Sequence, residues 1–182
     1  MPPYDVIKEA ERQRLAAEPL SAVQLTLEPK REEDTDQSNA YTRSRDRFRA
    51  WQVDGALARD SQPALYVLQQ EFEWDRKPYT RRHVVAAVRL HEFDEKVILP
   101  HEQIRQGPKD DRQRLIETSE ANYEPIFVLT MGRSDIFRAR MDAASAGEPS
   151  MDVTMSSGER HRTWKVSDAA GISAFQDALR NT

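Results

Sequence analysis

The chain has 182 residues, a formal net charge of −4 and no cysteine. Without cysteine, disulfides, thiolate catalysis and cysteine-based zinc or iron–sulfur sites are excluded. The four histidines form no H-x-x-x-H pair, and we expect no metal site. The net charge gives no bulk attraction to nucleic acid, so nucleic acid is not an expected partner.

Hydrophobic residues make up 38% of the chain and charged residues 32%, which predicts a single domain with a modest core. No apolar run approaches the roughly 20 residues of a membrane helix. The N-terminal stretch "MPPYDVIKEA" lacks the charged start and the apolar segment of a signal peptide. We therefore expect a cytoplasmic protein without a membrane partner.

The N-terminal third of the chain predicts two helices with a strand between them. The first helix begins at about Val6, and Asp5 is positioned to accept a hydrogen bond from its first turn. Residues 22–28, "AVQLTLE", alternate apolar and polar side chains, which indicates a half-buried strand. Residues 40–57 carry aromatic residues at helical spacing, and Gly55 is expected to end that helix.

The rest of the chain mixes strand-like and helix-like patterns. Strands are predicted at 64–74, 80–90, 97–99 and 125–131, a hairpin at 151–168, and helices at 108–122, 134–147 and 170–181. Because these elements show no strict βαβ alternation, the predicted fold class is α+β, with a mixed or antiparallel sheet and flanking helices.

The stretch "VILPHEQI" places His101 and Glu102 directly after the apolar run from Val97 to Leu99 and a proline. Pro100 cannot donate to a sheet ladder, so we expect the strand to end there and the polar pair to lie at a sheet end. A partly desolvated Glu102 at that place is a candidate general base toward a hydroxyl, with His101 beside it. The alternative interpretation is an ordinary polar strand end.

Four further residues are candidates for binding a substrate or a nucleotide, and each has a structural alternative. Arg133 in "MGRSD" lies between a predicted strand and a predicted helix, where backbone N–H groups can bind an anion, although one glycine is a weak signal. Arg112 in "KDDR" is a second basic candidate, with a surface ion-pair cluster as its alternative. Tyr4 and Asp5 in "PPYDV" are exposed in a rigid turn, where helix capping alone would explain Asp5.

Residues 158–164, "GERHRTW", combine a glycine with basic side chains, as phosphate-binding motifs do. They precede an alternating strand pattern, whereas a phosphate site of that kind uses the partial positive charge at the start of a helix. We interpret this stretch as a hairpin turn that leads into a strand.

Several short motifs occur in a fixed order along the chain. They are "PPYDVI", Asn39-x-Tyr41, Trp51 followed by Gly55, "PALYVLQQEF", "VILPHEQI", "DRQRL" and "EPIFVLT". In this order the chain resembles the bacterial and archaeal family catalogued as domain of unknown function 1015 (DUF1015). The resemblance runs through nearly the whole chain and by itself implies no activity.

The family's chains are about twice as long and usually carry an Asp-Gly-His-His-Arg motif soon after the position that ends this sequence. The motif does not occur here. The resemblance therefore implies that residues 1–182 are an N-terminal fragment of a longer protein. If the missing region supplies a strand, an open sheet edge is expected to favour self-association.

A remoter similarity gives the Pro-His-Glu stretch a meaning. A strand that ends in Pro-His-Glu, a helix and a "P-I" strand are similar to the free serine kinases of the ParB/sulfiredoxin-like superfamily, so part of that fold is expected here. The similarity implies that Glu102 is the catalytic base, that His101 is its neighbour and that Pro125-Ile126 leads toward a phosphate loop. It implies ATP or ADP with Mg²⁺ in the full-length protein and no cofactor in this fragment.

Three functional hypotheses follow. The first is the acceptor-side portion of a nucleotide-dependent, serine-like small-molecule kinase, inactive as this fragment. The second is a ParB-like nucleotide-binding or regulatory module. The third is a non-enzymatic interaction domain in which His101 and Glu102 merely end a strand.

Overall fold

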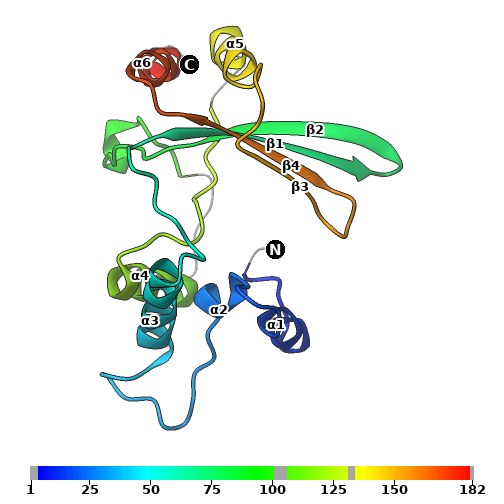
Figure 1. Cartoon of the computed structure of the whole chain (residues 1–182). Coiled ribbons are helices and arrows are strands. Elements are labelled where there is room, and N and C mark those ends of the chain that lie inside the picture. Colours follow the sequence, from blue (N-terminus) through cyan, green and yellow to red (C-terminus); the bar gives the residue numbers. More distant parts are fainter. Residues whose placement is uncertain (1–3, 101–105, 131–133, 181–182) are drawn as a thin grey trace. The chain divides into compact units, whose positions relative to one another are not determined.

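The computed structural model describes residues 4–100, 106–130 and 134–180, which fall into two compact units (Figure 1). The helical unit comprises Met1–Arg59 and His91–Ile126. The sheet unit comprises Asp60–Leu90 and Phe127–Thr182. The chain therefore passes from the helical unit to the sheet unit, returns, and enters the sheet unit again.

Short helices build the helical unit. They are α1 (Glu9–Ala16), α2 (Val23–Thr26), α3 (Ala40–Val53), the 3₁₀ helix η1 (Phe93–Glu95) and α4 (Gln106–Ser119). Helix α3 packs against α4 and α2, and α1 packs against α2. The buried side chains include small polar ones beside aliphatic ones: Val23, Leu25, Thr26, Ala40, Ser44, Leu115 and Ser119.

Local sequence signals define both ends of α3. The Asn39 side chain accepts hydrogen bonds from the backbone N–H groups of Tyr41 and Thr42, while the Asn39 N–H donates to the Thr42 hydroxyl at 2.9 Å. This reciprocal capping box satisfies N–H groups that have no partner within the helix. Past the other end, Gly55 has a φ of 76°, which a residue without a Cβ adopts at little cost.

The sheet unit contains one four-stranded antiparallel sheet in the order β2-β1-β4-β3. Its strands are β1 (Leu65–Trp74), β2 (Lys77–Val85), β3 (Met151–Thr154) and β4 (Arg160–Val166). The β1–β2 hairpin turns through Asp75 and Arg76, which both have positive φ as a type I′ turn requires. The β3–β4 turn contains Gly158, with a φ of 90°.

The helices α5 (Asp135–Ala144) and α6 (Ala169–Arg180) cover one face of this sheet (Figure 1). The core between them consists of buried Val67, Trp164, Val166 and Phe175. The Phe175 ring meets Phe137 of α5 edge to face, with the centroids 5.9 Å apart. Helix α6 is amphipathic, and its apolar stripe provides the contacts to the sheet.

The predicted α+β class with an antiparallel sheet is confirmed. The structure also contains the predicted helices at α3, α4, α5 and α6, the strand at β1, and the hairpin within 151–168. Strand β2 runs over Lys77–Val85, so the second half of the predicted strand at 80–90 lies beyond it.

Two expectations for the N-terminal third are wrong. Residues 22–28 contain the short helix α2 and no strand, because Val23, Leu25 and Thr26 are all buried against neighbouring helices. A short apolar run does not distinguish a helix from a strand, and here packing decides. Asp5 does not cap α1, which begins at Glu9 after a turn, with Lys8 at the N-cap.

Two predicted apolar strands are also wrong in the part that the structure describes. Residues 97–100 form no strand, and Val97 and Leu99 are 61% and 54% exposed. Residues 125–130 form none either, and Ile126 is 83% exposed. An apolar run becomes a strand only where a neighbouring strand accepts its backbone hydrogen bonds.

The capping box of α3 should be measurable as stability. We expect Asn39→Ala to lower the free energy of unfolding by about 1 kcal/mol, because two N–H groups of the first turn lose their acceptor. Urea denaturation followed by circular dichroism measures this difference. Asn39→Ser, which keeps a capping oxygen, is the control and should retain most of the stability; equal losses in both variants would contradict the assignment.

Candidate functional site

A half-open cleft of about 410 Å³ lies in the helical unit, beside α2, α3 and α4. Its lining combines aliphatic side chains with charges of both signs. The aliphatic and small residues are Leu25, Leu27, Pro29, Ala40 and Leu115, and the polar ones are Glu9, Arg12, Thr26, Glu28, Lys30, Tyr41, Ser44, Asp111 and Arg112. Such a lining suits a small, polar ligand better than an apolar one.

Arg112 of α4 is the centre of a polar network at one wall of the cleft. Its guanidinium donates to Asp111 Oδ2 at 2.6 Å and to Glu124 Oε2 at 3.2 Å. It also donates to the Thr26 carbonyl at 2.9 Å and lies 4.4 Å from the centre of the Tyr4 ring. These contacts tie α4 to α2 and to the N-terminal segment, so the first role of Arg112 is structural. We call Tyr4, Tyr41, Asp111, Arg112 and Glu124 the Arg112 network.

The two carboxyl groups beside Arg112 differ in their affinity for a proton. Burial, the largest influence on Asp111, raises its pKa, but hydrogen bonds from Arg112 and Tyr41 and the charges of Arg112 and Lys30 outweigh it. The pKa of Asp111 is therefore lowered, and the Tyr41 hydroxyl donates to it at 2.7 Å. Burial raises the pKa of Glu124, and the nearby negative charge of Asp5 raises it further. The charge and the hydrogen bond of Arg112 lower it, but the net pKa of Glu124 is raised. Asp111 is thus the more firmly ionised carboxylate.

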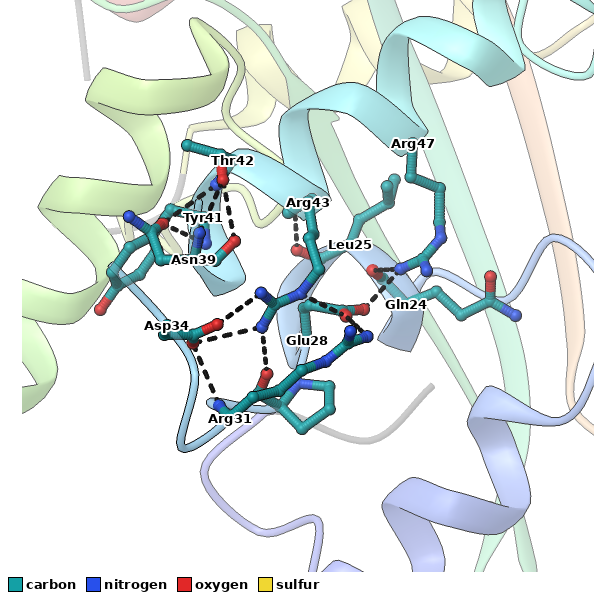
Figure 2. Close-up of polar contacts among 12 residues, drawn as sticks. Gln24, Leu25, Glu28, Arg31, Asp34, Asn39, Tyr41, Thr42, Arg43 and Arg47 are labelled. Atoms are coloured by element: carbon teal, nitrogen blue, oxygen red, sulfur yellow. Dashed lines mark hydrogen bonds and ion pairs between the residues drawn. The ribbon is translucent and has the colours of Figure 1, made fainter. Parts of the chain in front are cut away.

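Glu28 lies within a cluster of arginines (Figure 2). Its side chain is 7% exposed and accepts hydrogen bonds from Arg43 Nε at 3.1 Å and Arg47 Nη1 at 2.6 Å. Arg31 adds a contact at 3.4 Å, and Arg43 also pairs with Asp34 at 2.5 Å. Because three guanidinium groups hold this carboxylate, we assign Glu28 to fixing the loop after α2 against α3 and not to proton transfer.

Lys30 supplies a cation of a different kind. The Arg12 guanidinium in the same lining is engaged by Glu9 at 2.6 Å and 2.8 Å. The Lys30 side chain is exposed, and within the described ranges it makes no hydrogen bond or ion pair, although its charge contributes to the lowered pKa of Asp111. Lys30 is therefore the lining cation that remains available to an incoming anion.

The structure brings together part of the predicted site. Tyr4 and Arg112, predicted as separate candidates, are in direct contact, and the charge of Asp5 acts on Glu124 of the same network. The predicted His101, Glu102 and Arg133 lie outside the described residues.

Sequence reasoning missed three members of the Arg112 network: Tyr41, Asp111 and Glu124. The available signals were the Asn39-x-Tyr41 motif and the acidic start of "DRQRL". Neither signal reveals that the Tyr41 hydroxyl meets Asp111, because the two residues are 70 positions apart. Lys30 was missed as well, since it lies in a charged loop without any local pattern.

Two further observations bear on cofactors and membranes. In the part of the chain that the structure describes, no group of three or more His, Asp or Glu side chains is arranged to hold a metal ion. In the same ranges, no helix combines the length and the apolar character needed to cross a bilayer.

Comparison with known proteins gives the family. The family model described as "Protein of unknown function (DUF1015)" matches residues 1–182, and the chain belongs to this family. No curated protein and no solved structure matches the chain. The resemblance drawn from the motif order is confirmed, whereas the remoter similarity to ParB/sulfiredoxin-like kinases stays a prediction.

The lowered pKa of Asp111 predicts a pH-dependent contribution to stability. Its folded-state pKa lies below the ordinary value, so the carboxylate stabilises the fold above that value, and the contribution is lost as the pH falls through the folded-state pKa. We expect Asp111→Asn to cost on the order of 1 kcal/mol at pH 7, a modest amount because the side chain is 34% exposed. The cost should disappear in strong acid.

Urea denaturation of both proteins at pH 7 and at progressively lower pH measures the difference. Asp110→Asn is the matched control, since Asp110 is exposed on the same helix and accepts only from Gln106 among the described side chains. A cost of Asp111→Asn that did not change with pH would show that the ionised form has no special role.

Proposed function

We propose that this chain forms the acceptor-binding side of a nucleotide-dependent small-molecule kinase, whose acceptor is a serine-like compound with a hydroxyl, an ammonium and a carboxylate. The supporting observation is the cleft of about 410 Å³ that holds an ionised carboxylate, Asp111, and an unengaged cation, Lys30. A zwitterionic acceptor matches both charges. The volume falls within the range usual for small-ligand sites, roughly 300–1,000 Å³.

The residues of the cleft take different roles in this proposal. Asp111, held by Tyr41 and Arg112, binds the ammonium of the acceptor, because a carboxylate with a lowered pKa is a poor proton acceptor. Lys30 binds the carboxylate. Aliphatic residues such as Leu25 and Leu115 exclude water from the carbon skeleton.

The base is assigned by similarity and not by geometry. Phosphoryl transfer depends mainly on positioning and on neutralising charge, with one group that takes the proton of the attacking hydroxyl. We assign this role to Glu102 and a neighbouring role to His101, on the strength of the Pro-His-Glu similarity. Mg²⁺ in kinases is usually held by one or two carboxylates together with the nucleotide phosphates, and no residue is assigned to it here.

The nucleotide side is assigned to the Asp-Gly-His-His-Arg segment that does not occur in this sequence. In this proposal the chain of 182 residues binds the acceptor but does not transfer a phosphoryl group. Binding and turnover are therefore tested separately.

Acceptor binding is tested by calorimetry of the chain with L-serine and with O-phospho-L-serine. We expect saturable binding, and we expect Lys30→Ala to weaken it about tenfold, because one charge-assisted hydrogen bond is lost. Lys109→Ala, an exposed lysine of α4 outside the cleft lining, should leave the affinity unchanged. The absence of binding, or equal losses in both variants, would refute the acceptor site.

Turnover is tested with a longer chain that includes the Asp-Gly-His-His-Arg segment, in a phosphotransfer assay with ATP or ADP. We expect Glu102→Gln to lower the rate at least about 100-fold, the usual scale for losing a general base. Unchanged turnover would remove Glu102 from the mechanism.

Two other outcomes would favour the alternative functions. Binding of CTP without turnover would favour the ParB-like regulatory module. No effect of Glu102→Ala on binding or turnover would favour the non-enzymatic domain.

A further inference from the structure

The sheet of the sheet unit has two faces of different character. In an antiparallel ladder, paired residues share a face, and neighbours along a strand point to opposite faces. Val67 and its partner Trp164 face α5 and α6, so Phe72, paired with Tyr79, and Trp74, paired with Lys77, lie on the opposite face. We call this the open face, because both helices of the unit that pack against the sheet lie on the other side (Figure 1).

Aromatic rings gather on the open face of the β1–β2 hairpin. The rings of Phe72 and Tyr79 are stacked with an interplanar angle of 23° and centroids 5.8 Å apart. The Arg81 guanidinium lies 5.7 Å from the centre of the Phe72 ring. Tyr79 and Trp74 are 45% and 72% exposed, so their rings remain accessible. Exposed aromatic rings of this size, gathered on one face, indicate a contact surface rather than a core.

The carboxylates of the two hairpin strands lie on one face only, whereas cations lie on both faces, with Arg82 on the helix-covered face and paired with Asp142 of α5. The cations Lys77 and Arg81 lie on the open face, since they pair with Trp74 and Gln70. The carboxylates Glu71 and Glu73 alternate with the aromatic residues and therefore lie on the helix-covered face. Glu71 is neutralised there by Arg162. The two strands thus present aromatic and positive groups together on the open face without a carboxylate of their own, and the remaining carboxylate of the hairpin, Asp75, lies in the turn beside Arg76.

Two carboxylates reach the open face from outside this hairpin, and both are engaged. Glu159 contacts His161 at 3.4 Å and accepts a hydrogen bond from Gln70. Asp60 accepts from Lys165 at 2.5 Å. Arg81 donates one hydrogen bond to the neutral Gln70 side chain, and among the described residues neither Arg81 nor Lys77 forms an ion pair, so both charges are left for an anionic partner.

We propose that the open face of the β1–β2 hairpin binds single-stranded nucleic acid. Bases stack on Trp74 and Tyr79, and phosphates contact Lys77 and Arg81, which is how sheet surfaces bind single strands generally. The inference is independent of the proposed kinase role, which concerns the helical unit. The net charge of −4 gives the chain no general affinity for phosphates, so binding is confined to this face and is sensitive to salt.

The test is fluorescence anisotropy of a labelled oligouridylate of about ten nucleotides, titrated with the whole chain at low salt. We expect saturable binding. The logarithm of the association constant plotted against the logarithm of the salt concentration should have a slope of about −1.4, as two phosphate contacts predict. Trp74→Ala and Tyr79→Ala should each weaken binding at least about fivefold, the lower end for loss of one stacked base. Arg81→Gln should reduce the salt slope by about half, since it removes one of two phosphate contacts.

Matched variants separate binding from folding. Tyr79→Phe keeps the ring and should keep the affinity. Phe93→Ala removes an aromatic residue that is 63% exposed in the helical unit, and Glu73→Gln changes the opposite side of the hairpin; both should bind as the wild type does. Circular dichroism of each variant verifies that it is folded.

Three outcomes would overturn the proposal. The first is no binding at about 100 μM protein, the weak limit for non-specific nucleic-acid affinity. The second is equal affinity for duplex and single strands, which would exclude base stacking. The third is capture of the chain by vesicles of phosphatidylserine and phosphatidylcholine, lost in Trp74→Ala, without any binding of the oligonucleotide, which would make the hairpin a membrane contact.

Discussion

The two-residue period of β1 is the constraint on which the sheet unit depends. This strand lies between β2 and β4, so its backbone groups are hydrogen-bonded on both sides. Its alternation sends Val67 into the core with Trp164 and sends Phe72 and Trp74 to the other face. A slip of one residue would exchange the two sets, turning Val67 out of the core and placing Phe72 and Trp74 on the helix-covered face. The packing of the helices and the character of the open face therefore follow from a single register.

The helical unit depends on polar contacts to a greater extent. Its helices are short, and several buried side chains are hydroxyls that bond to backbone carbonyls. The Ser44 hydroxyl donates to Leu25 across two helices at 2.6 Å, and the Ser119 hydroxyl donates to Leu115 at 2.6 Å. Buried polar groups need such partners. The Ser119 bond lies within α4, whereas the Ser44 bond joins α3 to α2 and restricts how these two helices pack. The charged cleft lies among these contacts, which explains why most of its charged side chains are already engaged and why Lys30 differs from them.

The candidate site shows which of its residues could be predicted from the sequence and which could not. Tyr4 and Arg112 were identifiable one at a time, from a rigid turn and from a basic residue near a helix start. Their contact was not, since neither residue carries a signal about the other. The contact between the Tyr41 hydroxyl and Asp111 could not be predicted either. Burial raises the pKa of Asp111 and its hydrogen bonds lower it, and both effects depend on the tertiary structure. The sequence shows which titratable residue types are present, whereas the pKa of each carboxyl group depends on its surroundings in the folded protein.

The sequence by itself determined the elements whose signals are local. Asn39 and Gly55 mark the ends of α3, Gly158 lies in the β3–β4 turn, and the motif order established the family. Only the tertiary structure decided the secondary structure of the short apolar runs. Residues 22–28 became helical through packing, and the runs at 97–99 and 125–130 formed no strand. A cap or a turn satisfies its own backbone groups within a few residues, but a strand depends on a neighbour that no local pattern specifies.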